Sequence, residues 1–146
     1  MVDAGQPAPD FVAPIQDGTS LKFSSLRGQP VVLYFYPKAD TPGCTIESKG
    51  FRDVYPEFTA KKVRVVGVSV DDCPAQQAFM DKYGLPFPLV ADSKKEVSTL
   101  YGVLGPSGTA RRVSFLIDAQ GKVLEVVDTR DATEHVARAK ARFLSS

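Results

Sequence analysis

Cysteine and histidine are scarce in this chain of 146 residues, which contains two cysteines and one histidine. This scarcity of thiols and imidazoles excludes a fold held together by disulfides and most metal sites. Neither a metal nor another cofactor is therefore expected. In the reducing cytosol a cysteine is more often inert or catalytic than bridged. A cytoplasmic location is therefore predicted.

An excess of one charge and long apolar runs are also missing. Lys and Arg number 18 against 17 Asp and Glu, a formal net charge of +1. A composition with charges this balanced does not indicate binding to nucleic acid or to an anionic membrane. No apolar run approaches the roughly 20 residues of a membrane span, and the first residues do not resemble a secretory signal. Neither nucleic acid nor membrane is expected as a partner.

The composition is that of an ordinary globular protein, with 43% hydrophobic and 24% charged residues. The length is close to that of one average domain, and a chain of this size buries roughly 70% of its unfolded surface without staples. We find no internal repeat and no linker. A single domain over residues 1–146 is predicted.

The first half of the chain predicts a hairpin followed by two central strands. Phe11–Ile15 and Thr19–Phe23 flank a central Asp-Gly pair, a strong hairpin signal. Pro30–Tyr36 and Val63–Val70 are continuous apolar runs, typical of strands covered on both faces. Between them, Thr41–Tyr55 has helical spacing, so the segment predicts a right-handed βαβ unit. The apolar side of this helix is expected to carry Ile46, Phe51 and Val54.

The second half predicts shorter elements that complete an α/β sandwich. They are a helix from Asp72 or Pro74 to Gly84, a short strand at Phe87–Ala91, a short helix at Lys94–Tyr101, a hairpin of Val113–Ile117 with Lys122–Val127, and a helix from about Asp131 with Glu134 in a capping box. The order β-β-β-α-β-α-α-β-β-α predicts a mixed central β-sheet flanked by helices, with an N-terminal β-hairpin.

The segment after the first central strand carries the chemistry. Thr41 is a good N-cap and Pro42 suits the first helical position, which leaves the amides of Gly43 and Cys44 without helical partners. The thiol of Cys44 then lies at the positive end of the helix dipole, where the thiolate is favoured. The two free amides can donate to an oxygen held in front of the sulfur.

Two interpretations of Cys44 remain open from the residues alone. Pro37 ends the strand and shapes one wall of a pocket over the thiol, at the carboxyl end of the strands where ligands bind in open α/β sheets. Against a reactive thiol, a cysteine in a helix is usually a small buried hydrophobe. Thr-Pro-Gly is also a common way to begin a helix that has no function.

Three of these residues carry a family resemblance. Pro37, Thr41 and Cys44 match the Pro-x-x-x-Thr-x-x-Cys signature of peroxiredoxins. The surrounding stretch, residues 35–45, resembles the bacterioferritin comigratory protein (peroxiredoxin Q) subfamily. The similarity continues in four further blocks, Ala8–Phe11, Gly67–Asp71, Phe87–Asp92 and Arg112–Asp118. The resemblance implies a thioredoxin-like fold, in agreement with the element order.

The resemblance also implies a role for each matching residue. Cys44 would be the peroxidatic cysteine, which attacks the O–O bond of a hydroperoxide and becomes a sulfenic acid. Thr41 would direct its hydroxyl to the thiolate and the peroxide, although the same oxygen is a candidate cap for the amide of Cys44. Arg112 would stabilise the thiolate and polarise the substrate, with Glu47 orienting it and Gly43 helping to bind the peroxide. Without the resemblance, the preferred interpretation of Arg112 is a solvated charge at the start of a strand.

The resolving cysteine of many subfamily members is absent from its usual places. Lys49 stands five residues after Cys44, and Phe79 and Met80 occupy the middle of the following helix. Cys73 is the remaining candidate, because parallel neighbouring strands bring both cysteines to one edge of the sheet. A disulfide between Cys73 and Cys44 and a one-cysteine enzyme with a passive Cys73 both remain open.

The implied activity is that of a thiol-dependent peroxidase. It would reduce hydrogen peroxide and organic hydroperoxides, be recycled by thioredoxin or a similar thiol donor, and work as a monomer or weak dimer. The alternatives are a redox relay, in which Cys44 passes its oxidation to a partner protein, and an inactive binding module. His135 is predicted to be a surface residue of the last helix, which argues against a Cys-His hydrolase.

Overall fold

The fold is built on a mixed five-stranded sheet with strand order β5-β4-β3-β6-β7. The computed structural model describes residues 1–144. The strands β3, β4 and β5 are parallel, whereas β6 runs antiparallel to β3 and β7 antiparallel to β6. The strands span Val31–Phe35 (β3), Arg64–Ser69 (β4), Leu89–Ala91 (β5), Val113–Ile117 (β6) and Val123–Asp128 (β7). The predicted α/β architecture with a mixed sheet is confirmed.

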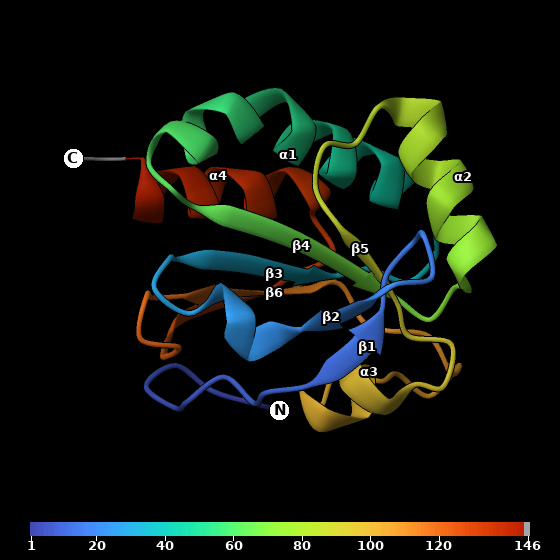
Figure 1. Cartoon of the computed structure of the whole chain (residues 1–146), viewed down its shortest axis with the longest axis horizontal. Helices are drawn as coiled ribbons and strands as arrows, with labels where there is room; N and C mark the ends of the chain where they lie inside the picture. Colours follow the sequence, from blue (N-terminus) through green and yellow to red (C-terminus); the bar gives the residue numbers. More distant parts are fainter. Residues whose placement is uncertain (145–146) are drawn as a thin grey trace.

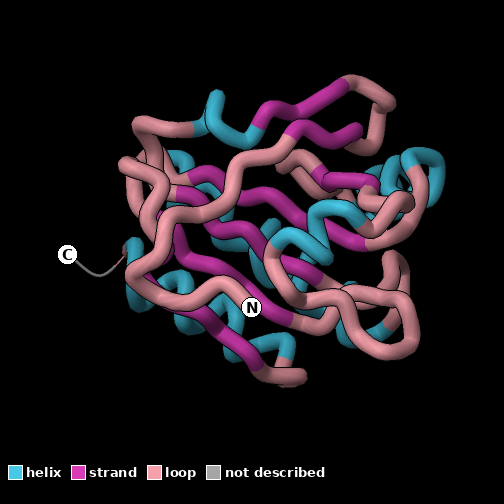
Figure 2. The backbone as a smooth tube through the Cα atoms, turned by 90° about the horizontal axis from the view of Figure 1, so that it is seen from below, coloured by secondary structure: helices cyan, strands magenta, loops and turns pink. Residues whose placement is uncertain are grey.

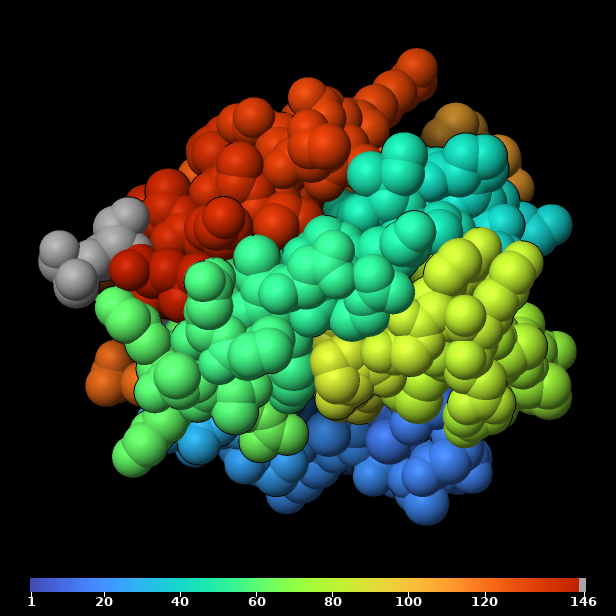
Figure 3. Space-filling view, turned by 90° about the horizontal axis from the view of Figure 1, so that it is seen from above, coloured from blue at the N-terminus to red at the C-terminus, as the bar shows by residue number. Residues whose placement is uncertain are grey.

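Helices and a hairpin cover opposite faces of this sheet (Figure 1). One face carries α1 (Pro42–Ala60), α2 (Cys73–Tyr83) and α4 (Ala132–Phe143), and the space-filling view from above shows α1 lying between α2 and α4 (Figure 3). The other face carries the short helix α3 (Glu96–Leu100), the 3-10 turn η1 (Phe23–Leu26) and the predicted hairpin of β1 (Val12–Pro14) and β2 (Ser20–Lys22). Figure 2 shows the layers from below, with the strands side by side. None of the helices within residues 1–144 is long and apolar enough to cross a membrane.

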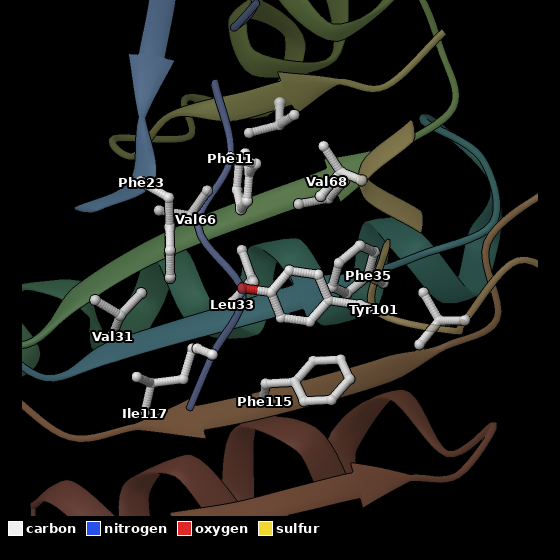
Figure 4. Close-up of a cluster of buried hydrophobic side chains, with 14 of the residues drawn as sticks. Phe11, Phe23, Val31, Leu33, Phe35, Val66, Val68, Tyr101, Phe115 and Ile117 are labelled. Atoms are coloured by element: carbon white, nitrogen blue, oxygen red, sulfur yellow. The ribbon is translucent and has the colours of Figure 1, made fainter. Parts of the chain in front are cut away.

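Side-chain alternation along β3 divides the core into two clusters. Val31, Leu33 and Phe35 point to the hairpin face, where they join Phe115 and other apolar side chains (Figure 4). Val32, Tyr34 and Tyr36 point to the helical face, where Cys44 and Phe51 of α1 lie. Because both faces are covered, every residue of β3 is buried, as its continuous apolar run predicts.

Helix α1 differs from its prediction in length and in the side that it buries. It continues through Pro56 to Ala60, since Phe58 beyond the proline is buried and outweighs one missing backbone hydrogen bond. Ile46 is 54% exposed, so its expected place on the inner side is wrong. The inner side instead includes the polar residues Glu47 and Ser48, which no apolar periodicity can identify.

The later elements follow the prediction with small corrections. Asp72 caps α2 and Gly84, at φ 61°, ends it. Asp131 caps α4 by accepting from the amide of Thr133, but the capping box does not form, since the amide of Asp131 donates to the hydroxyl of Thr129 and not to Glu134. The short strand expected at Phe87–Ala91 is present as β5, so the sheet has one strand more than the predicted order counted.

Candidate active site

Cys44 lies in the first turn of α1, directly after the chain leaves the central strand β3. Its side chain is fully buried. The first backbone bond of the helix runs from the amide of Thr45 to the carbonyl of Thr41, at 2.8 Å. The amides of Gly43 and Cys44 precede it and have no hydrogen-bond partner among the described residues. Two N–H donors therefore accompany the sulfur at the positive end of the helix.

Thr41 occupies the predicted N-cap position, but its side chain does not cap the helix. Its hydroxyl donates to the carbonyl of Lys38 at 2.7 Å. This carbonyl comes within reach because Asp40 adopts a left-handed conformation, φ 59°, while its carboxylate accepts from Lys82 and Tyr83 of α2. The candidate capping bond to the amide of Cys44 is therefore wrong, and that amide stays free.

Arg112 connects the sulfur to a carboxylate. It precedes β6, the antiparallel neighbour of β3, and its side chain is only 11% exposed. One nitrogen, Nη2, lies 3.4 Å from Sγ of Cys44, and Nη1 donates to Oε1 of Glu47 at 2.8 Å. The guanidinium is thus held against the thiol and not in solvent. Burial works against its charge, but Glu47 and Cys44 outweigh burial and raise the pKa of Arg112.

Gly43 makes room for this guanidinium. A Cβ atom at position 43 would lie 2.8 Å from Nη2 of Arg112, closer than real Cβ contacts allow. The glycine therefore permits the close approach of Arg112 to the first turn of α1. The space beside Gly43 is thus occupied by an arginine of this chain.

Glu47 lies one turn after Cys44 and is completely buried. Burial raises the pKa of Glu47 to about 8, although the neighbouring Arg112 acts to lower it. The oxygen Oε1 accepts from Arg112, whereas Oε2 is buried without a hydrogen-bond partner. A carboxyl group with one satisfied and one orphaned oxygen lies directly behind the guanidinium.

His135 is fully buried, so its predicted surface position is wrong. Its Nε2 lies 2.8 Å from the carbonyl of Thr129, its Nδ1 lies 2.7 Å from Oγ of Ser114, and Nδ1 is 3.5 Å from Oε2 of Glu47. Burial lowers the pKa of His135. A lone histidine on an amphipathic helix gives no signal for this, since its partners lie on β6, α1 and the β7–α4 loop. The histidine touches Glu47 and not the sulfur, so the two do not form a Cys-His pair.

A cleft of about 730 Å³ leads to the site. Pro37, which follows β3, and Arg112 both line it. Arg111 and Arg130 add positive charge to its wall, and Arg111 pairs with Asp128 at 2.6 Å. Cys44 does not line the cleft, so a ligand there would meet the guanidinium of Arg112 first.

Cys73 is the first residue of α2 and is half-buried. It leaves the same edge of the sheet as the loop before Cys44, because β3 and β4 are parallel neighbours. The two loops are joined by a hydrogen bond of 2.8 Å from the amide of Ala39 to the carboxylate of Asp71. Both thiols are free in the structure.

A buried thiol in the first turn of a helix, beside a guanidinium and after the central strand of a mixed sheet, defines a thiol-based oxidoreductase. Comparisons with known proteins agree. The model of the AhpC/TSA family matches residues 4–126. A putative peroxiredoxin, Bcp, of Coxiella burnetii is 40% identical and aligns over 97% of this chain and 99% of its own length. A chloroplastic peroxiredoxin Q of Populus jackii is 41% identical over 84% of this chain and 58% of its own.

A solved structure extends this similarity to the fold. The crystal structure of the peroxidoxin BcpB from Mycobacterium tuberculosis superposes with a TM-score of 0.92 at 36% identity, over 100% of both chains. The chain belongs to the AhpC/TSA family, within which it is a peroxiredoxin of the Bcp or peroxiredoxin Q kind and so a thiol-dependent peroxidase with a thioredoxin-like fold. The resemblance inferred from Pro37, Thr41 and Cys44 is confirmed.

Proposed function

We propose that the protein reduces hydrogen peroxide and organic hydroperoxides with Cys44 as the peroxidatic residue. The observation that carries this proposal is the position of Arg112, which contacts Sγ of Cys44 and is anchored on Glu47. A fixed guanidinium favours the thiolate over the thiol and needs no reorganisation when the substrate arrives. Catalysis by a thiolate that already exists requires no histidine base.

The reaction forms one S–O bond and breaks one O–O bond. The Cys44 thiolate attacks the terminal oxygen of the hydroperoxide, and this oxygen stays on the sulfur with its proton as the sulfenic acid. The leaving oxygen takes one proton from solvent to become an alcohol or water. The free amides of Gly43 and Cys44 and the guanidinium of Arg112 are the donors for the oxygens that gain charge. The hydroxyl of Thr41, whose proton is engaged by Lys38, can accept from the peroxide O–H. Pro37 shapes the wall of the cleft beside them.

A thiol donor must then return the sulfenic acid to the thiolate, and thioredoxin or a similar dithiol fits this chemistry. Two routes fit the chain. In the first, Cys73 attacks the sulfenic acid, releases water and forms a disulfide that the donor reduces. In the second, the donor attacks the sulfenic acid of Cys44 directly. The half-buried position of Cys73 at the same sheet edge supports the first route, after local rearrangement of the start of α1.

The proposal also includes the cellular location and the oligomeric state of the protein. Both thiols are free, which suits a reducing compartment, so we place the protein in the cytoplasm. The family resemblance supports a monomer or weak dimer.

Peroxide consumption in the presence of thioredoxin, thioredoxin reductase and NADPH tests the proposed function. Wild type should turn over many equivalents of hydroperoxide, and Cys44→Ser should lose roughly 10⁴-fold or more of the rate. If Cys73 resolves the sulfenic acid, peroxide-treated wild type contains an intramolecular disulfide that Cys73→Ser lacks. Oxidation that stops at one equivalent and passes to a captured protein would instead identify a redox relay.

A further inference from the structure

We propose that His135, the histidine behind the active site, is a positioning residue. It shares one buried proton with Glu47 and thereby leaves the Arg112 guanidinium available to the Cys44 sulfur. The inference deepens the proposed function and rests on it, because it concerns how the same site holds its thiolate. Nothing in the resemblance that identified the family involves this residue.

The hydrogen bonds of His135 fix its protonation at one nitrogen. The carbonyl of Thr129 can only accept, so Nε2, at 2.8 Å, must donate to it. The other nitrogen, Nδ1, faces the hydroxyl of Ser114 at 2.7 Å and Oε2 of Glu47 at 3.5 Å. The imidazole thus spans from the β7–α4 loop to the carboxyl group that anchors Arg112.

The orphaned oxygen of Glu47 points to a proton at this place. Oε2 is completely buried and accepts no hydrogen bond, and an unsatisfied buried oxygen is unfavourable. Nδ1 of His135 lies 3.5 Å from it, a distance that one proton between the two would shorten into a hydrogen bond. Either protonation of Glu47 or protonation of Nδ1 supplies this proton, so it belongs to the pair and not to one residue.

The charges of the site require the same proton. A Cys44 thiolate and a Glu47 carboxylate would both claim the single guanidinium of Arg112, which leaves one uncompensated negative charge in a buried place. A proton on the pair restores neutrality. Burial, which outweighs the lowering effect of Arg112, already raises the pKa of Glu47 to about 8.

The other charged and titratable groups that face the cluster do not replace this proton. Asp128 is paired with Arg111, and Asp131 accepts from Thr133 at the start of α4. Both carboxylates add negative charge near His135. Tyr34 on β3 shares a hydrogen bond of 2.8 Å with Ser48.

The test is the pH dependence of Cys44 alkylation by iodoacetamide, measured in the Cys73→Ser background so that one thiol reports. The variants are His135→Gln, Glu47→Gln and the two combined. Glutamine at position 135 can keep the bond to Thr129 but cannot hold the shared proton. Without the imidazole, Glu47 must hold the proton alone and releases it at a lower pH, after which its carboxylate competes for Arg112, so the alkylation midpoint should rise by about one pH unit.

Glu47→Gln separates this effect from a structural one. The glutamine oxygen can accept from Arg112 while its NH₂ group donates to Nδ1, which imitates the protonated pair at every pH. The shift caused by His135→Gln should therefore fall to less than about a third of its size in the Glu47→Gln background, as expected for coupled neighbours.

Equal shifts in both backgrounds, or no shift in either, would overturn the proposal. If His135→Gln does not fold, as circular dichroism would show, His135→Asn is measured in the same two backgrounds. Asparagine places its amide near the position of Nδ1 and holds no titrating proton, so the same dependence on Glu47 is expected and its absence contradicts the proposal. Alkylation needs neither peroxide nor reductant, so failure here is distinguishable from failure of the proposed function.

Discussion

The two faces of the sheet are built from the same strands but differ in what they bury. The hairpin face holds an apolar cluster in which Phe115 packs edge-on against Phe35 and Tyr101 (Figure 4). The helical face buries polar side chains among its apolar ones. They are Glu47, Ser48, Ser69, Gln76, Ser114 and His135. The hairpin face is mainly apolar and buries Asp92 and Ser98 beside α3, whereas the helical face holds charged groups near Cys44.

The difference shows how one strand can serve stability and chemistry together. On the helical face, Tyr34 and Tyr36 satisfy their hydroxyls with Ser48 at 2.8 Å and Gln76 at 2.6 Å. Buried polar networks of this kind fix a unique arrangement when every member is satisfied. The exception on this face is Glu47, whose Oε2 has no hydrogen-bond partner and lies 3.5 Å from Nδ1 of His135. An incomplete network at the site and a complete apolar core opposite it should respond differently to substitution.

The largest effect should come from the apolar face. Phe115→Ala removes a fully buried ring that packs on two aromatic neighbours, so we expect a loss of about 4 kcal/mol in the free energy of unfolding. Urea denaturation monitored by circular dichroism measures this. The rate of Cys44 oxidation per folded molecule should stay that of wild type. A loss near zero would mean that the hairpin face does not carry the fold.

Glu47 on the helical face should make the free energy of unfolding depend on pH. The folded pKa of Glu47, about 8, is raised above the value of 4.5 for a free carboxyl. Between these values the native state keeps a proton that the unfolded state has released, so the free energy of unfolding falls as pH rises. From pH 5 to pH 8 this term amounts to about 3 kcal/mol in wild type and is absent in Glu47→Gln.

Parallel urea titrations of the two proteins at several pH values isolate this difference. The pKa of His135 is lowered, so its contribution has the opposite sign and is lost as pH falls below the unfolded value of 6.5. This contribution acts only below about pH 6.5, whereas the Glu47 contribution extends to about pH 8, so the pH range separates the two. Identical pH profiles for wild type and Glu47→Gln would show that Glu47 is ionised throughout.

A substitution at the guanidinium should affect chemistry more than stability. Lysine at position 112 keeps the positive charge but cannot contact Sγ of Cys44 and Oε1 of Glu47 with two fixed donors. We expect Arg112→Lys to lower the second-order rate with hydroperoxide by about 100-fold. Stopped-flow measurement of the first oxidation gives this rate without the reductant. A lysine variant as fast as wild type would show that charge alone suffices.

The smallest effect should come from one hydroxyl on the helical face. Ser48→Ala leaves the buried hydroxyl of Tyr34 without its partner, so the free energy of unfolding should fall by about 1–2 kcal/mol. The matched control is Ser25→Ala, whose hydroxyl donates to Lys22 at an exposed position. We expect the control to change stability by less than about 0.5 kcal/mol. Equal effects would remove the distinction between buried and exposed hydroxyls.

Sequence reasoning predicted most of the fold because local patterns set it. The apolar run at Val31–Phe35 gave the central strand, Asp72 and Gly84 gave the ends of α2, and the Thr-Pro-Gly start gave the first turn of α1. The end of α1 was missed because a proline is tolerated where a buried Phe58 holds the helix beyond it.

The candidate site was only partly predictable. Family resemblance singled out Arg112 and Glu47, but the closeness of Gly43 to the guanidinium depends on how β6 packs beside α1. His135 was placed on the surface because its burial depends on Ser114 and Thr129, which come from other elements. Polar contacts between distant segments leave no periodic signal along one chain.

The central claim is that Cys44 is a nucleophilic thiolate that hydroperoxide oxidises. Its most direct test is to treat Cys73→Ser at neutral pH with one equivalent of hydroperoxide in the presence of dimedone, and to locate the adduct by mass spectrometry. We expect rapid formation of a sulfenic-acid adduct on Cys44, and slower formation in Arg112→Lys. An unmodified Cys44, or an adduct that forms only in strongly alkaline solution, would contradict it.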